Sequence, residues 1–171
     1  MWYVIQTQTG HEEKLKTMLD RTMPEGVECS CELFFYESKR RYLGTWNIER
    51  KLLFPGYVIA VTEDVTSVDN QLKKLPEFGR FLRHGSDIVP LSDDEVSLIR
   101  KLTGDTGTVA MSYGMQVGDK VRVTEGALVG LEYRIVKIDR HKRKAVIEIE
   151  LFREKKEITV GLEILVKVND R

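Results

Sequence analysis

The sequence is poor in the features that mark membrane, secreted and metal-binding proteins. Its 171 residues include only two cysteines and three histidines, and its 27 basic side chains are matched by 27 acidic ones. No stretch reaches the roughly 18 apolar residues that a membrane-spanning helix needs. The first residues, Met1 to Ile5, carry no basic segment and no small-residue cleavage site, so a secretory signal is not expected. These absences predict a cytoplasmic globular protein with no membrane contact. We also expect it to be a monomer.

The same scarcity argues against a metal site. Cys29 and Cys31 form a C-x-C pair, which cannot close a tetrahedral zinc site without two further ligands, and His11 is far away in sequence. In a strand this spacing places both side chains on one face. We therefore expect two ordinary buried residues of a reduced protein and no bound metal.

Catalytic motifs are also missing. His11, His84 and His141 have no second ligand at a metal-binding spacing, and the sequence contains no G-x-S-x-G, Walker A or G-x-G-x-x-G pattern. The adjacent acids Asp93 and Asp94 are explained by helix capping. The sequence therefore predicts no enzyme and no cofactor.

Strands and helices alternate over residues 1–102. Strand-like runs occupy residues 2–8, 27–36 and 57–61, and helical patterns follow Gly10, begin at Val65 and follow a capping box at Ser92 to Glu95. This alternation predicts an α+β sandwich with helices on a mostly antiparallel sheet.

A different pattern begins after a segment, 103–115, that is rich in glycine and threonine and is predicted to be a flexible linker. Residues 116–171 hold five short β-branched runs, with turn signals at Gly126, Gly130, Asp139 and Gly161. Such runs are typical of a small SH3-like barrel. Residues 118–171 carry 13 basic and 10 acidic groups, a net charge of +3 against −3 for the rest.

Two segments are candidates for binding sites. Leu53–Val58 is apolar and bends at Pro55-Gly56; it is either a core strand with a bend or a docking surface. Asp139–Lys144 packs four fixed cations and a histidine into one turn. That turn is either a solvated loop or an edge that binds RNA phosphates. The candidate RNA-binding residues are Lys137, Arg140, His141, Lys142, Arg143, Lys144, Arg153, Lys155 and Lys156.

These segments, in this order, resemble the NusG family of bacterial transcription elongation factors. The resemblance is carried by Trp2-Tyr3-Val4 with Gly10–Lys14, by Phe54–Val58, by Pro90–Val96 and by the KOW-like stretch Gly118–Ile135. It implies an N-terminal NGN domain over 1–102, a linker over 103–115 and a KOW domain over 116–171. Within the family, the stretches Asp139–Lys144, Glu150–Phe152 and Val160–Glu163 look most like the LoaP antiterminators.

The resemblance also implies partners. The NGN domain would bind the clamp helices of the largest RNA polymerase subunit, hold the polymerase in its elongating state and suppress pausing and termination. The residues carried into that contact are Trp2, Phe54, Pro55, Tyr57 and Phe78. A LoaP-like KOW domain would recognise a structured leader RNA hairpin. The alternatives are a general NusG-type elongation factor whose KOW domain contacts proteins, and a ribosome-associated KOW protein.

Overall fold

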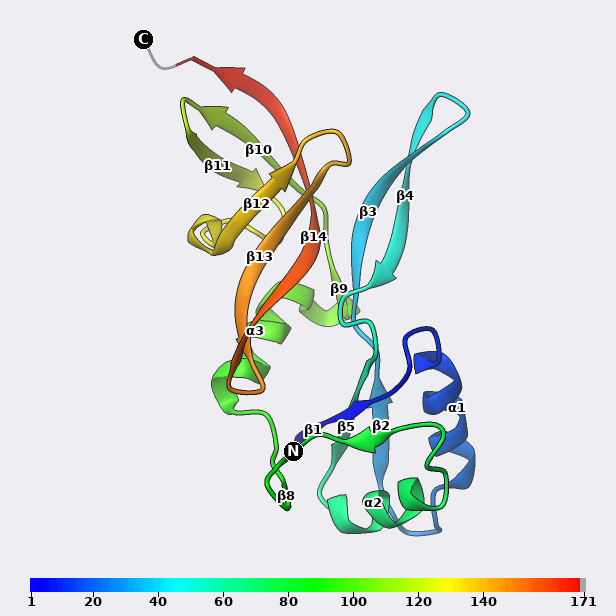
Figure 1. Ribbon diagram of the computed structural model, residues 1–171. Coiled ribbons are helices and arrows are strands. Elements are labelled where there is room, and N and C mark those ends of the chain that lie inside the picture. The colour runs from blue at the N-terminus through cyan, green and yellow to red at the C-terminus, as the bar shows by residue number, and fades with distance from the viewer. Residues whose placement is uncertain (170–171) are drawn as a thin grey trace. The chain divides into compact units, whose positions relative to one another are not determined.

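The computed structural model describes residues 1–169 (Figure 1). The chain divides into two compact units. The first unit combines Met1–Leu33 with Phe54–Val96, and the second combines Phe34–Leu53 with the chain from Ser97 onward. Each unit is described by itself.

The first unit is built on a four-stranded antiparallel sheet. The strand order is β2-β5-β1-β6, and the strands are β1 (Trp2–Gln6), β2 (Cys29–Glu32), β5 (Tyr57–Thr62) and β6 (Arg80–Phe81). In the central pair, Trp2 lies opposite Val61 and Gln6 lies opposite Tyr57. The two central strands are rich in β-branched and aromatic residues, which pack well on a pleated surface.

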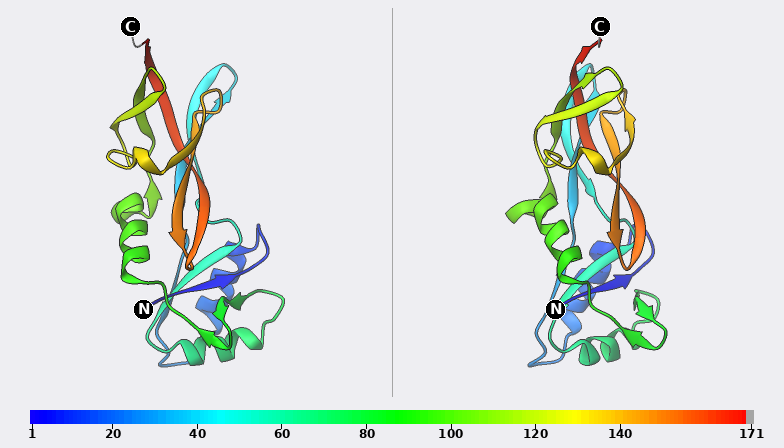
Figure 2. Two further views of the ribbon diagram at one scale, coloured as in Figure 1. Left: turned by 60° about the vertical axis from the view of Figure 1, so that its left-hand side comes forward. Right: turned by 90° about the vertical axis from the view of Figure 1, so that its left-hand side faces the viewer.

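Two helices, α1 (Glu12–Thr22) and α2 (Val65–Lys73), cover one face of this sheet (Figure 2). Strand side chains alternate between faces, so every second residue of β1 and β5 points to the helices. The resulting core joins Tyr3, Ile5, Val58, Ala60, Leu15, Leu19, Val68 and Leu72. Cys31 is buried in this core and Cys29 packs against it, which agrees with the expected placement of both cysteines on one strand face.

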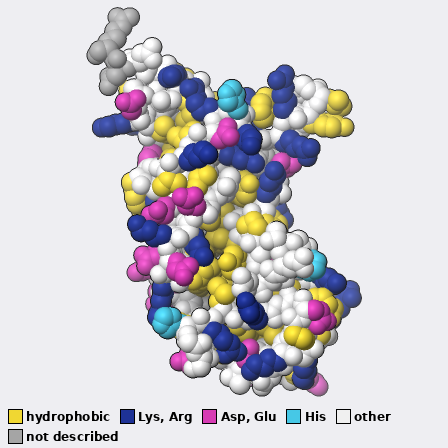
Figure 3. Space-filling view, in the orientation of Figure 1, with side chains coloured by type: hydrophobic (Ala, Val, Ile, Leu, Met, Phe, Trp, Pro, Cys, Tyr) yellow, Lys and Arg dark blue, Asp and Glu magenta, His cyan; other side chains and the backbone are white. Residues whose placement is uncertain are grey.

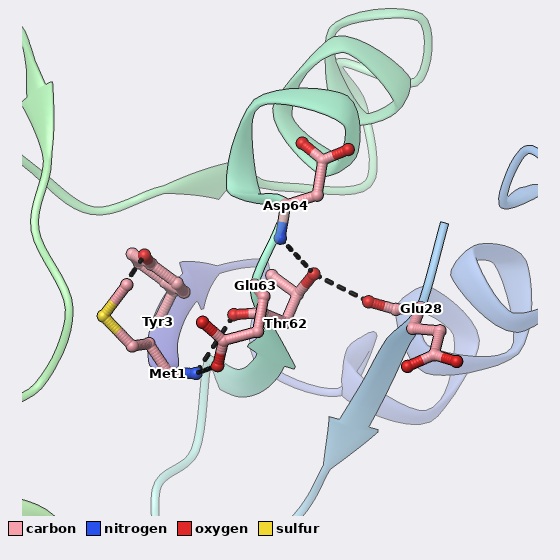
Figure 4. A network of polar contacts seen from close by, with 6 residues as sticks. All are labelled: Met1, Tyr3, Glu28, Thr62, Glu63 and Asp64. Carbon is pink, nitrogen blue, oxygen red and sulfur yellow. Dashed lines mark hydrogen bonds and ion pairs between the residues drawn. The ribbon is translucent and has the colours of Figure 1, made fainter. Parts of the chain in front are cut away.

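Polar contacts fix the Trp2 end of the sheet (Figure 4). The Met1 nitrogen donates to the Thr62 carbonyl at 3.1 Å and to Glu63 at 2.5 Å. The Thr62 hydroxyl donates to the Glu28 carbonyl at 2.7 Å and accepts from the Asp64 N–H at 3.1 Å. Strands β1, β2 and β5 are therefore tied together at their outer end.

The remaining chain of the first unit forms a small hairpin and a helix start. Strands β7 (Arg83–His84) and β8 (Asp87–Ile88) pair with each other, and α3 spans Asp93–Thr103. The predicted capping box is confirmed: Ser92 accepts from the Glu95 N–H at 3.2 Å, and Glu95 accepts from the Ser92 N–H at 2.8 Å.

The second unit begins with a long β-hairpin, β3 (Phe35–Tyr42) and β4 (Thr45–Leu52), whose strand β3 also pairs with the short β9 (Thr108–Val109). The hairpin turn is Leu43-Gly44, and both residues have positive φ (47° and 81°). Two such residues make the turn that matches the natural twist of a two-strand ribbon.

A five-stranded sheet completes the second unit, in the order β11-β10-β14-β13-β12. The strands are β10 (Ser112–Val117), β11 (Lys120–Glu125), β12 (Ile135–Asp139), β13 (Lys144–Leu151) and β14 (Glu154–Val168), with 3-10 turns η1 (Gly104–Thr106) and η2 (Glu132–Arg134). Strands β10 and β14 are parallel and the other pairs are antiparallel. The predicted α+β class, with an antiparallel N-terminal sheet and a β-rich C-terminal part, is confirmed.

Two features of this region differ from the sequence-based expectation. The segment 103–115 was expected to lack regular structure, yet it contains η1, β9 and the start of β10. Gly161 was expected to mark a turn, but it lies inside the single strand β14. A Cβ atom at Gly161 would lie 2.4 Å from the Glu37 carbonyl oxygen and 2.1 Å from the Met111 sulfur. This glycine therefore permits a close packing contact, which a sequence pattern cannot distinguish from a turn.

Within residues 1–169, no helix is long and apolar enough to cross a membrane. The same residues contain no group of three or more His, Cys, Asp or Glu side chains placed to hold a metal ion.

Candidate protein-binding and nucleic-acid interfaces

The apolar candidate site is a tight turn, Phe54-Pro55-Gly56-Tyr57. The Tyr57 N–H donates to the Phe54 carbonyl at 3.1 Å, and Gly56 has φ +84°. Proline at the second position and a residue with positive φ at the third define a type II turn, so the Pro-Gly pair dictates this geometry. The turn leads directly into β5.

A buried carboxylate holds the turn in place. Glu12 is 1% exposed, and its Oε1 accepts from the Gly56 N–H at 2.6 Å while its Oε2 accepts from the Gly10 N–H at 2.8 Å. The Gly56 carbonyl in turn accepts from the Thr7 N–H at 2.9 Å. Sequence reasoning assigned Glu12 only to the first turn of a helix, because nothing in the local pattern indicates a partner 44 residues away. Glu12 is the main residue of this site that the sequence did not reveal.

The five predicted polymerase-binding residues differ in accessibility. Pro55 is exposed and Tyr57 is partly exposed, as are Trp2 and Phe78. Phe54 is only 8% exposed and offers little surface to a partner in this structure. The accessible part of the turn therefore consists of Pro55 and Tyr57.

The structure brings Phe78, but not Trp2, to the end of the sheet that carries the turn. The Phe78 carbonyl accepts from the Thr7 hydroxyl at 2.5 Å, and the Lys14 ammonium lies 5.0 Å from the centre of the Phe78 ring. Phe78 packs against the core on the helix side of the sheet, whereas Tyr57 points to the other side. Trp2 lies four residues further along the ladder, about 13 Å from the Tyr57 end.

The nine candidate RNA-binding residues fall into two groups at opposite ends of β13. Lys144 opens this strand and Leu151 closes it, so the ends are roughly 23 Å apart. The group at the β12–β13 turn contains Lys137, Arg140, His141, Lys142, Arg143 and Lys144. The group at the β13–β14 turn contains Arg153, Lys155 and Lys156. The structure therefore does not join them into one surface.

The first group, which we call the basic turn (residues 137–144), has Arg140, His141 and Lys142 exposed at its tip. The Asp139 carboxylate accepts from the Lys142 N–H at 2.9 Å, and this hydrogen bond lowers the pKa of Asp139. The carboxylate thus shapes the turn and stays charged at neutral pH.

Both lysines of the second group pair with carboxylates. Lys155 pairs with Glu148 at 3.3 Å and Lys156 pairs with Glu154 at 3.2 Å. Phe152 and Arg153 both have positive φ (59° and 60°) and form the turn without a glycine. Because its lysines already have carboxylate partners, this end of β13 attracts phosphate less than the basic turn does.

The β3–β4 hairpin adds cations beside the basic turn. The sequence showed the basic run Lys39-Arg40-Arg41 but gave it no role. Burial, and then the neighbouring ammonium of Lys51, lowers the pKa of Lys144. Figure 3 shows Lys and Arg side chains gathered over the hairpin and the basic turn. Like charges held this close are typical of surfaces that bind anions.

The geometry describes a two-unit α+β protein with an apolar turn in one unit and a cationic turn in the other. The family profile described as "NusG: Transcription termination factor nusG" matches residues 1–100. This chain belongs to the NusG family. Membership places it among transcription factors rather than enzymes.

Individual relatives agree with this assignment over nearly their whole length. The transcription termination/antitermination protein NusG of Streptococcus pyogenes is 28% identical, with 86% of each chain covered. The protein of the same name from Campylobacter jejuni is 23% identical, with 88% of each chain covered. A solved structure of Thermotoga maritima NusG is 23% identical, covers 95% of this chain and 93% of that chain, and has a TM-score of 0.50. This neighbour supports the fold, with an NGN-type and a KOW-type part.

Proposed function

We propose that this protein is an antitermination factor that binds RNA polymerase through the first unit and a structured leader RNA through the second. The observation that carries the RNA part is the basic turn, where Arg140, His141 and Lys142 are exposed together at one tip. Phosphate backbones are bound chiefly by such cations, and RNA is often recognised by its shape and phosphates. The resemblance to LoaP antiterminators points the same way.

The polymerase contact in this proposal is made by Pro55 and Tyr57. Phe78 lies at the same end of the sheet but on its helix side, and would contribute only to a contact that also covers that side. The partner would be the clamp helices of the largest polymerase subunit, a helical hairpin that an aromatic surface can receive. Phe54 would support the turn from inside, because it is buried. Trp2 would contribute only to an interface that reaches the other end of the sheet.

RNA binding by the full chain tests the proposal, and it distinguishes the basic turn from the β13–β14 turn. The probe is a fluorescein-labelled leader RNA stem–loop, titrated in a filter-binding or anisotropy assay at low salt. The double variant Arg140→Glu/Lys142→Glu should lose binding by roughly a hundredfold, the effect of reversing two phosphate contacts. The matched control is Lys155→Glu/Lys156→Glu, which reverses two charges at the other end of β13 and should change binding less than about threefold. Equal losses in both variants would contradict a specific role for the basic turn.

Two other functions predict different outcomes. A general NusG-type elongation factor would bind polymerase and change pausing, and neither double variant would alter its effect. A ribosome-associated protein would co-sediment with ribosomes and leave terminator readthrough unchanged. In-vitro transcription across a terminator, on templates with and without the leader, distinguishes all three.

A further inference from the structure

Arg143 of the basic turn makes two contacts that the proposed function does not explain. Its guanidinium lies 3.6 Å from the centre of the Trp46 ring on β4, and its Nη1 lies 3.2 Å from Glu163 Oε1 on β14. Stacking on an aromatic face and pairing with a carboxylate are the two interactions that an arginine makes best. Arg143 is thus held inside the second unit while the tip of its turn is exposed.

The backbone reinforces this placement. Arg143 has φ +52°, a left-handed conformation that is unfavourable for a residue with a side chain. Its carbonyl accepts from the Leu162 N–H at 3.0 Å, which places the turn directly beside Glu163. Backbone strain of this kind persists where the surrounding contacts favour it, and such sites are often functional. Trp46 and Glu163 supply those contacts.

Glu163 is shared between two cations, one from strand β3 and one from the basic turn. Lys39 of β3 forms a short ion pair with Glu163 Oε2, while Arg143 pairs with the other oxygen. The Lys39 ammonium also lies 4.8 Å from the centre of the Tyr113 ring. Glu163 is largely buried, with 15% of its side chain exposed. If Arg143 moves away, Lys39 still pairs with the carboxylate, so releasing Arg143 does not leave a buried charge alone.

A hollow lies next to these contacts. Its volume is about 350 Å³, and its lining includes Arg140, His141, Arg143 and Glu163. A phosphate that entered it would meet the arginines and be repelled by the Glu163 carboxylate. The same carboxylate therefore holds Arg143 and opposes an anion at the basic turn.

We propose that Trp46 of the β3–β4 hairpin and Glu163 of β14 hold Arg143 in competition with RNA, so that these two contacts restrain RNA binding at the basic turn. This inference rests on the proposed function, because it concerns the regulation of the same turn. An RNA phosphate must displace Glu163 from Arg143 and draw the guanidinium off the Trp46 ring. Binding free energies are reciprocal, so RNA in turn loosens the hairpin contact by the same factor.

The test measures RNA affinity and the state of Trp46 in the full chain. Glu163→Gln keeps the shape of the side chain and removes its charge; Trp46→Ala removes the stacking surface. Each should tighten binding of the leader stem–loop by roughly five- to fiftyfold, which lies within the usual range of coupling between two sites. Glu157→Gln is the matched control, since it removes one exposed charge from the same strand and should change affinity less than about twofold. Tyr42→Ala, which removes an exposed ring of the same hairpin, is the control for Trp46→Ala.

A second readout follows the exposure of Trp46 directly. In a Trp2→Phe background Trp46 is the one remaining tryptophan, since the sequence has two. Acrylamide should quench Trp46 more strongly in Glu163→Gln than in Glu157→Gln, and added RNA should raise quenching in the protein that retains Glu163.

The outcomes separate this inference from the proposed function. Unchanged RNA affinity in Glu163→Gln and Trp46→Ala, with normal binding by the wild-type chain, would overturn the competition and leave RNA binding intact. No RNA binding by any of these proteins would overturn both. Tighter RNA binding in both variants but in neither control, together with stronger acrylamide quenching of Trp46 in Glu163→Gln, is the result that supports the competition.

Discussion

The Phe54–Tyr57 turn and the basic turn each present a few side chains at a fixed place, but different interactions hold them there. The first is held by a buried carboxylate, Glu12, that accepts two backbone N–H groups. The second is held by an exposed hydrogen bond to Asp139 within its own turn, and the charges at its tip face water. Buried hydrogen bonds are strong and insensitive to salt, whereas exposed charges are weak and screened. The two turns should therefore lose their binding function under different conditions.

The largest expected effect is on the first turn. Glu12→Ala leaves the Gly10 and Gly56 N–H groups without their buried acceptor, which should cost about 3 kcal/mol of unfolding free energy. Urea unfolding followed by circular dichroism measures the loss. The exposed neighbour supplies the control, because Glu13→Ala should change stability by less than about 0.5 kcal/mol. Similar stabilities for the two variants would show that Glu12 does not hold the turn.

The second largest effect is the difference in salt dependence between RNA binding and polymerase binding. Raising the salt from about 50 to about 200 mM should weaken binding of the leader RNA by roughly fiftyfold, if about four phosphates are contacted. The same change should weaken polymerase binding less than about threefold, because an apolar contact is not screened. Parallel titrations of one protein preparation with RNA and with polymerase measure both. A steep salt dependence of the polymerase contact would contradict an apolar interface.

The side chain of Tyr57 provides a third test. Tyr57→Ala should weaken polymerase binding by about tenfold or more, the cost of losing a central aromatic contact. Tyr42→Ala removes a more exposed tyrosine, 64% accessible, from the end of β3 in the second unit and is the control. Surface-immobilised polymerase core and the full chain give the affinities. If Tyr42→Ala were as harmful as Tyr57→Ala, the contact would have to include the hairpin.

Acid should affect the first unit by a smaller amount. Burial raises the pKa of Asp69, but hydrogen bonds from Lys73 and Arg83 outweigh it and lower the pKa overall. A lowered carboxylate pKa stabilises the fold above the unfolded-state pKa, and this contribution disappears as pH falls through the folded-state value. Asp69→Asn should therefore flatten the acid side of the stability curve below about pH 5. Urea midpoints across a pH series measure it, and identical slopes for both proteins would argue against the ion cluster.

Local patterns in the sequence predicted the local structure well. The Pro-Gly pair produced a type II turn, and Ser92 with Glu95 produced a capping box, since both depend only on residues a few positions apart. The sequence predicted the correct number of C-terminal strands, five, but not the correct residues for all of them. Strand β10 was missed and β14 was divided, because Gly114 and Gly161 permit close packing instead of turns.

The sequence identified candidate residues for the two sites, but it did not show which of them are exposed or lie on the same surface. Phe54 was expected to be accessible and is buried, since sequence cannot show which side of a turn is covered. Lys155 and Lys156 were grouped with the basic turn, yet an eight-residue strand separates them from it and acids from β13 and β14 neutralise them. Such pairings depend on sheet register, which no local pattern encodes.

The sequence by itself determined the periodicity of the strands and helices, the tight turns, and the concentration of positive charge after residue 118. These features follow from backbone preferences and composition, which act over a few residues. Only the tertiary structure decided that Glu12 supports the Phe54–Tyr57 turn and that Trp46 and Glu163 engage Arg143. Those contacts join residues 20 to 97 positions apart, so they exist only once the chain has folded and buried the groups concerned.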